Sequence, residues 1–309
     1  MDREMNKTDI NQELLSSAVA CDPKRMEKLL LKGADPNVAD MLGDNALTWV
    51  IRGSTPPEEI ERYNEVAKLT HQQPIDKDDR PIKCLKLLLK AGADPNQRNN
   101  LQRTALRPAA ETSATFTKLL LKKGADPDLQ DVTGYTALMA AAVTGNAKSI
   151  KALIKYKADL DLQDNAQRSA IFWGIEHHQD LAVKAILKGK PNLNVQNKDG
   201  RTALMMTIID RDENVFDLVL DAHPDLDILD ARDQSAEDYA VSTEKSHTSC
   251  PPFSAKLRKR REDNAETAKQ QQEEQDAQKA FNDQAKTQRR HQQHRGLRNF
   301  IHNKKTHRP

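Results

Sequence analysis

The sequence predicts an all-α fold: a solenoid of about six helix-turn-helix repeats plus a partial C-terminal cap, followed by a polar, charged tail that is helical or disordered. Two short markers keep the same period along most of the chain, and the composition changes where they stop. Hydrophobic residues make up 37% of the chain and charged residues 30%, which suits an elongated or partly unpacked chain. Repeats stacked on their neighbours would still bury one continuous core.

The period is read from two independent markers. The first is the pentapeptide Gly-Ala-Asp-Pro-Asn with its degenerate forms, which begin at Gly33, Gly92, Gly124, Lys157, Lys190 and His223. Successive copies are 59, 32, 33, 33 and 33 residues apart. The second marker is Thr-Ala-Leu with its variants, which begin at Thr104, Thr136, Ser169, Thr202 and Ser235. Because the two markers stay in phase, they indicate one internal repeat.

Each period contains the signals of two helices. Thr136, Ser169 and Thr202 are predicted N-caps, because their hydroxyls can accept hydrogen bonds from the first helical turn. A short helix of small residues follows, then a turn such as Gly145-Asn146, then a second helix with apolar residues at helical spacing. The marker glycine ends the second helix in a left-handed conformation, and Asp-Pro-Asn leads into a turn.

This unit resembles the ankyrin repeat, which is a turn followed by two antiparallel helices, with a Thr-Pro-Leu-His signature and a Gly-Ala-Asp near its end. The resemblance covers residues 10–243. Alanine replaces the signature proline, and the histidine position holds Arg107, Met139, Phe172 and Met205. The threonine–histidine hydrogen bond of the family is therefore absent, and we expect a less regular array.

Three later copies lack the cap glycine. Lys157, Lys190 and His223 stand in its place. If these residues are left-handed, each costs roughly 1–2 kcal/mol. We therefore expect the later repeats to be individually weaker and to depend on their neighbours.

The signals divide the chain into four parts. Residues 1–9 are expected to be disordered and residues 10–243 to form the repeats. Residues 244–253 are expected to be a linker, and residues 254–309 a basic tail rich in Gln, Lys and Arg.

The second repeat carries an insertion at residues 54–79, because its markers are 59 rather than 33 residues apart. The insertion separates a first helix over 46–52 from a second over 82–90, and Pro56-Pro57 is predicted to start a helix inside it. It is either a tolerated surface loop that packs on the repeat edge or a second recognition surface.

The charge is distributed unevenly between the repeats and the tail. Residues 251–309 contain 15 Lys/Arg and 7 Asp/Glu, against 33 and 39 in the rest of the chain. The tail opens with a basic targeting cluster that resembles a nuclear localisation signal, namely Lys256, Arg258, Lys259, Arg260 and Arg261. Nuclear import, contact with a phosphate or acidic partner, and plain solubility all remain open for it. The polar, basic C-terminus also resembles the translocation signals of bacterial type IV secretion substrates.

The sequence gives no sign of catalysis, metal or cofactor. Its three cysteines have no motif spacing, and Cys84 is expected to be a small core residue. We expect no membrane span and no secretory signal peptide. His177-His178 is expected at a surface turn or a partner contact, and Phe172 and Trp173 are expected to serve packing. Phosphate-loop, dinucleotide-binding and nucleophile-elbow motifs are absent from the sequence.

The resemblance implies that a partner would contact the turn fingers and the exposed ends of the first helices. Carried over by phase, the candidate groove residues are Leu101, Arg103, Glu111, Val132, Thr133, Tyr135, Val143, Thr144, Asn165, Ala166, Arg168, Glu176, His177, Lys198, Arg201, Ile209 and Asp210. Tyr135, Arg168 and Arg201 are the predicted hot spots. This mixture of apolar, aromatic and oppositely charged residues favours a protein partner over nucleic acid, except through the tail.

We therefore expect a monomeric, non-enzymatic adaptor that binds one or more proteins through an ankyrin groove. It would be cytoplasmic, and a sharper form of the hypothesis is a bacterial effector secreted into a host cell. The alternative is a nuclear or nucleic-acid-associated regulator that works through its basic tail.

Overall fold

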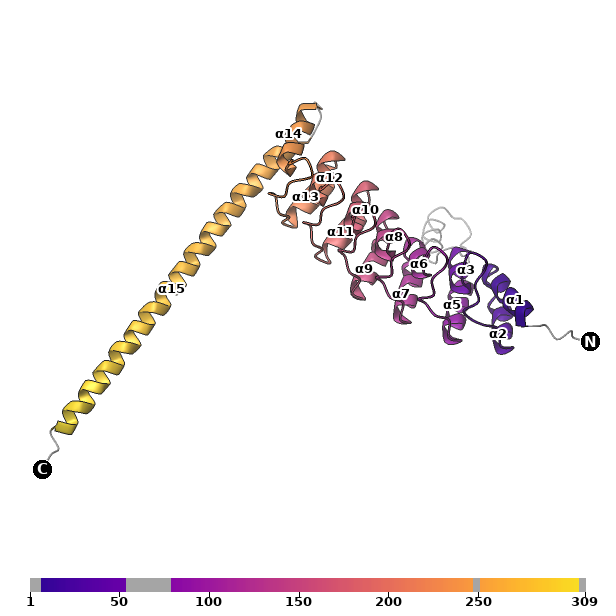
Figure 1. Ribbon diagram of the computed structural model, residues 1–309, viewed down its shortest axis with the longest axis horizontal. Helices are drawn as coiled ribbons and strands as arrows, with labels where there is room; N and C mark the ends of the chain where they lie inside the picture. The colour runs from indigo at the N-terminus through magenta and orange to yellow at the C-terminus, as the bar shows by residue number, and fades with distance from the viewer. Residues whose placement is uncertain (1–6, 54–78, 247–250, 306–309) are drawn as a thin grey trace, which may run out of the picture. The chain divides into compact units, whose positions relative to one another are not determined.

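The computed structural model describes residues 7–53, 79–246 and 251–305, and the chain divides into two compact units, Met1–Pro251 and Pro252–Pro309. The described part of the first unit is helical apart from loops and one isolated bridge between Ala39 and Asn45. Figure 1 shows its helix pairs stacked in chain order.

Six helix pairs build the described part of the first unit. The first helices of the pairs are α1 (Lys7–Val19), α3 (Ala46–Arg52), α6 (Leu106–Thr112), α8 (Ala137–Val143), α10 (Ala170–Glu176) and α12 (Ala203–Ile209). The second helices are α2 (Pro23–Leu31), α5 (Arg80–Lys90), α7 (Ala114–Lys122), α9 (Ala147–Lys155), α11 (Asp180–Leu187) and α13 (Glu213–Asp221). The single helix α14 (Ala236–Ser246) packs on α12 as the C-terminal cap.

The three predicted N-cap positions are confirmed, and two of the three residues make the expected side-chain hydrogen bond. The Thr136 hydroxyl accepts a hydrogen bond from the Met139 N–H at 3.2 Å, and Thr202 caps α12 in the same way. Ser169 is the N-cap residue of α10 as predicted, but the expected hydrogen bond is missing, because its hydroxyl is buried and has no hydrogen-bond partner among the described residues. The Met139 sulfur accepts from the Thr136 N–H at 3.5 Å, and so takes the role of an acidic side chain in a capping box.

The left-handed caps are confirmed. Gly33 has a φ of +88°, and φ is also positive at the matching positions, +63° at Lys157, +60° at Lys190 and +60° at His223. The side chains at these three positions do not prevent the left-handed turn, but their Cβ atoms make it less favourable than glycine would.

The Asp-Pro-Asn marker recurs because it links neighbouring repeats. The Asn96 side-chain oxygen accepts a hydrogen bond from the Asp126 N–H at 2.7 Å, one repeat further along the chain. Asp128 accepts from the Asp159 N–H at 2.8 Å in the same way. Each copy therefore holds the next, and either an amide or a carboxylate oxygen can do so.

The core lies between the two rows of helices. Among the first helices, α8 contributes mainly small residues, such as the buried Ala140 and Ala141, and this allows close stacking there. The second helices contribute larger ones, such as the buried Phe116 of α7. Cys84 and Phe172 are fully buried, so their predicted packing role is confirmed.

Several predicted boundaries shift. Helix α1 begins at Lys7, inside the segment 1–9 that was expected to be disordered, and α14 runs to Ser246, inside the expected linker. The second unit contains α15 (Phe253–Lys305), so the tail is helical over these residues. The predicted helix at Pro56-Pro57 and all but one residue of the insertion lie outside the described residues. Within the described part of the chain, no helix is long and apolar enough to cross a membrane.

Candidate functional site

Six loops, which we call fingers, join one repeat to the next at residues 40–45, 99–104, 131–136, 164–169, 197–202 and 230–235. Each begins with Asp or Asn, whose side-chain oxygen accepts the backbone N–H groups two and four residues later. In the third finger, Asp131 accepts from Thr133 at 2.8 Å and from Tyr135 at 3.1 Å. This local bonding holds every finger in the same tight turn.

Backbone hydrogen bonds join the fingers into a row. The Val132 N–H donates to the Leu101 carbonyl at 3.2 Å, and the Asn165 N–H donates to the Thr133 carbonyl at 2.9 Å. A glutamine before the finger adds a second link, since the Gln130 amide donates to the Gly134 carbonyl at 2.8 Å and to the Gln163 carbonyl at 2.9 Å. The fingers are therefore a rigid platform and not independent loops.

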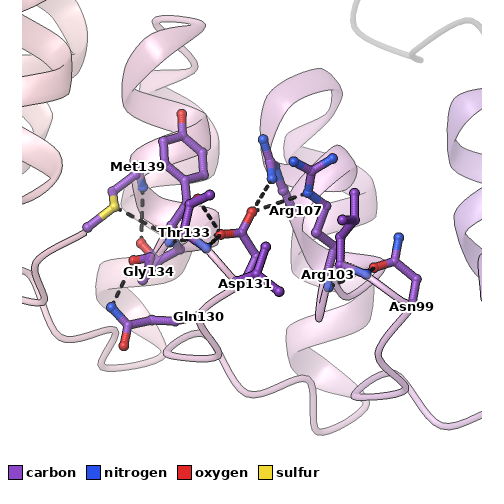
Figure 2. A network of polar contacts seen from close by, with 12 residues as sticks. Asn99, Arg103, Arg107, Gln130, Asp131, Thr133, Gly134 and Met139 are labelled. Carbon is purple, nitrogen blue, oxygen red and sulfur yellow. Dashed lines mark hydrogen bonds and ion pairs between the residues drawn. The ribbon is translucent and has the colours of Figure 1, made fainter. Parts of the chain in front are cut away.

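Asp131 is the centre of a polar network that joins two repeats (Figure 2). One carboxylate oxygen accepts from Thr133 and Tyr135, and the other accepts from Arg103 Nε at 3.2 Å and Arg107 Nη1 at 2.6 Å. Burial acts to raise the pKa of Asp131, but the hydrogen bonds from Thr133, Tyr135 and Arg103 outweigh it and leave the pKa below its usual range. Asp131 therefore stays charged and fixes both guanidinium groups.

Beside this network, two aromatic rings contact each other, and each ring also contacts one guanidinium group. The Arg107 guanidinium carbon lies 4.7 Å from the centre of the Tyr135 ring, and that of Arg168 lies 3.8 Å from the Trp173 ring. Tyr135 meets Trp173 edge-on, with ring centres 5.1 Å apart. Burial raises the pKa of Tyr135 to about 12, so its hydroxyl stays protonated near neutral pH. These contacts orient the exposed parts of four large side chains before any partner arrives.

Two hollows open on this face. The aromatic hollow, of about 440 Å³, is lined by Arg107, Thr133, Tyr135, Val143, Asp164, Asn165, Ala166, Arg168 and Trp173. The arginine hollow, of about 260 Å³, is lined by Asp44, Thr48, Arg52, Arg103, Thr104, Arg107, Pro108, Glu111 and Thr112. Arg107 is common to both, so the two hollows are adjacent. Neither contains a metal-binding cluster, and none occurs elsewhere among the described residues.

The structure brings many of the predicted groove residues together. Six of them line the aromatic hollow: Thr133, Tyr135, Val143, Asn165, Ala166 and Arg168. Two others, Arg103 and Glu111, line the arginine hollow. Leu101 and Val132 are exposed on neighbouring fingers, and Glu176 forms an ion pair with Arg168 at 2.9 Å. The exposed His177 ring lies 5.5 Å from the Trp173 ring.

The remaining predicted residues line neither hollow, and these are Thr144, Lys198, Arg201, Ile209 and Asp210. The predicted hot spot Arg201 donates to the Tyr239 hydroxyl at 3.0 Å, and this ties it to the C-terminal cap. Through this bond, Arg201 is part of the packing of the last repeat. Asp210 has a buried oxygen without a hydrogen-bond partner among the described residues, and burial raises its pKa.

Sequence reasoning missed three important residues. Trp173 was expected to serve packing at a core or half-buried position; it is half-buried, and it also forms a wall of the aromatic hollow. Arg107 was noted only as a departure from the family signature, and Arg52 was not considered. A glutamine recurs directly before the finger at Gln130, Gln163 and Gln196, and this regular spacing could have revealed the link between fingers.

Comparison with known proteins finds ankyrin repeats in part of the chain. A family model described as ankyrin repeats (3 copies) matches residues 77–164. The chain is similar to the crystal structure of the ankyrin repeat domain of Bcl-3, described as a member of the IkappaB protein family, with a TM-score of 0.60 and 19% identity over 74% of this chain and 92% of that one. No curated protein sequence matches the chain. Because 475 solved chains share the likeness, the fold does not single out a partner.

Proposed function

Because this chain carries ankyrin repeats, a fold that mediates protein–protein interaction, we propose that it is a non-enzymatic adaptor that binds a protein partner through the two hollows of its finger face. The observation that carries the proposal is the ordered row of Arg107, Tyr135, Trp173 and Arg168 around the aromatic hollow. Tyrosine, tryptophan and arginine are the residue types that dominate binding energy at protein interfaces.

Preorganisation supports this function. The guanidinium group of Arg168 is held by Asp164 at 3.0 Å and by Glu176 at 2.9 Å while it stacks on Trp173. A partner would therefore order few side chains on binding, and each side chain that is already fixed avoids a loss of about 0.5–1.5 kcal/mol. The volume of the aromatic hollow suits a bulky side chain of the partner as an anchor.

Site-specific photo-crosslinking tests the proposal. A photoreactive phenylalanine analogue would replace Asn165, which is exposed at the aromatic hollow, or Lys151, which is exposed on the second helix α9. In eukaryotic cell lysate, we expect a discrete crosslinked protein from position 165 and not from position 151. Equal labelling from both positions, or none from position 165, contradicts a binding role for this face.

The tail supports a separate proposal, that it directs the chain to its place of action. Arg258, Lys259 and Arg261 of the basic targeting cluster are exposed on α15, and the tail carries 15 Lys/Arg against 7 Asp/Glu. The destination would be the nucleus, or a host cell if the chain is a secreted bacterial effector. Imaging the full chain with the cluster changed to glutamine tests nuclear import, and a translocation reporter fused to the full chain tests secretion.

A further inference from the structure

The arginine hollow differs in chemistry from the aromatic hollow beside it. Three guanidinium groups surround it, those of Arg52, Arg103 and Arg107. The first comes from α3 in the second repeat, and the other two come from the finger and first helix of the third repeat. The hollow therefore exists only when these two repeats are stacked.

The charges at this hollow are layered. Two of the three carboxylates that hold the arginines are almost fully buried, with 5% of the Asp44 side chain and 2% of the Asp131 side chain exposed, whereas 35% of the Glu111 side chain is exposed. The guanidinium side chains are more open, at 40% for Arg52, 32% for Arg103 and 23% for Arg107. At Arg52 and Arg103 a ligand would meet positive charge first, because the carboxylates of Asp44 and Asp131 lie beneath the guanidinium groups.

Most of the hydrogen-bonding capacity of the three arginines is unused within the described residues. Three guanidinium groups have fifteen N–H donors. Four hydrogen bonds to carboxylates are present: from Arg52 to Asp44, from Arg103 to Asp131, and from Arg107 to Asp131 and Glu111. The geometry of a guanidinium group suits a carboxylate, which can accept two parallel hydrogen bonds.

Apolar side chains that do not line the hollow are exposed on the fingers that contribute to it and on the next finger. Leu42 precedes Asp44 by two residues and is 65% exposed, and Leu101 precedes Arg103 by two residues and is 46% exposed. Val132 on the next finger is 52% exposed, and the backbone bonds between fingers place the three in one row. The fifth finger carries Lys198 and Asp199 at the matching positions, so the apolar row is confined to the earlier fingers.

We propose that the arginine hollow receives an acidic side chain from an extended segment of the protein partner, with neighbouring apolar residues of that segment on Leu42, Leu101 and Val132. This inference rests on the proposed function, and it specifies the chemistry of the partner. A nucleic acid fits less well, because the apolar row of Leu42, Leu101 and Val132 would face a phosphate backbone.

Peptide selection on the full-length chain tests this inference. A library of random dodecapeptides would be panned on the chain, and the enriched peptides would be synthesised with a fluorescent label for anisotropy titrations. We expect a consensus with Asp or Glu next to apolar residues. Both Arg52→Gln and Arg103→Gln should weaken binding at least about tenfold, and so should a rise in salt from about 0.05 to about 0.5 M, because the contact is partly exposed.

Arg98→Gln is the matched control, since Arg98 is an exposed arginine that lines neither hollow. It should leave the affinity unchanged. Two arginine variants are used so that misfolding of one does not decide the result, and the unfolding midpoint of each checks its fold.

The outcomes separate this inference from the proposed function. Peptides without acidic residues that lose affinity on Trp173→Ala, but not on Arg52→Gln or Arg103→Gln, would uphold binding at the finger face and overturn the acidic segment. Peptides that are indifferent to Trp173→Ala and to both arginine changes would overturn both. If sedimentation shows that the chain self-associates and Arg52→Gln abolishes this association, the occupant of the hollow is a second copy of the chain, and the inference is overturned.

Discussion

Asp131→Asn isolates the contribution of the buried charge that joins the third and fourth repeats. Asn99 and Asn197 already occupy the equivalent position in two other fingers, where they accept the same backbone N–H groups. Asparagine at 131 should therefore keep the turn and lose only the two charge-assisted bonds from Arg103 and Arg107. Hydrogen bonds to charged groups contribute about 1.5–3 kcal/mol each, but both arginines remain partly hydrated after the change, so we expect a total loss of about 2 kcal/mol.

Urea unfolding followed by tryptophan fluorescence measures this loss, because both tryptophans of the chain, Trp49 and Trp173, lie in the repeats. Asp199→Asn is the control: Asp199 also pairs with an arginine, at 3.2 Å, but its side chain is 64% exposed, and its loss should change stability by less than about 0.5 kcal/mol. If Asp131→Asn is no more costly than Asp199→Asn, the buried network does not stabilise the stack.

The same variant predicts a change in acid stability. The pKa of Asp131 is lowered in the folded state, so its contribution is present above the unfolded value of about 3.9 and is lost as the pH falls through the folded pKa. Unfolding midpoints measured below about pH 4 should therefore fall less steeply for Asp131→Asn than for the parent chain. Parallel curves would show that Asp131 does not titrate with a lowered pKa.

Three further pairs of variants test the reasoning on the fold by the same unfolding assay. Ser169→Ala should be neutral or stabilising by up to about 1 kcal/mol, because it removes a buried hydroxyl that has no partner among the described residues, whereas Thr136→Ala should cost about 1 kcal/mol because it removes a helix cap. Equal losses of stability would show that the two hydroxyls do not differ in this way. Lys190→Gly should stabilise the fold by about 0.5–1 kcal/mol, because Lys190 is left-handed and glycine is not strained there, whereas Lys188→Gly should destabilise the fold, because Lys188 has an ordinary φ of −64°. A loss of stability at both positions would argue against backbone strain at Lys190. Gly200→Ala should cost about 1–3 kcal/mol more than Gly33→Ala, because a Cβ at 200 would lie 2.5 Å from the Ala231 nitrogen while a Cβ at 33 meets nothing within 4 Å. Similar losses of stability for the two variants would contradict the clash at 200.

The repeat phase was predictable because its signals are local. Turn residues, caps and apolar spacing lie within a few positions of each other, and they placed α3 at residues 46–52 as the structure has it. The candidate site was only partly predictable, because its contacts cross between repeats. The Arg107 guanidinium bonds Asp131, 24 residues later, and no local pattern identifies which acidic side chain an arginine will reach.

Trp173 shows a second limit of the sequence. Its neighbour Phe172 is fully buried, and adjacent aromatic residues on one helix look alike in a hydrophobic pattern. They differ because Trp173 faces the fingers, where Arg168 and Tyr135 cover only part of its ring. The same holds for Ser169, whose type predicts a cap although its hydroxyl makes no hydrogen bond among the described residues.

The central claim is that the finger face holds a protein partner, and hydrogen exchange on the intact chain tests it without any mutation. The protein captured at position 165 would be purified and added to the full-length chain, and amide exchange would be compared with and without it. We predict slower exchange in the fingers at 131–136 and 164–169 and in α10, with no change in α9 and α11. Protection confined to the second helices or to α15 would contradict the claim and move the binding site elsewhere on the chain.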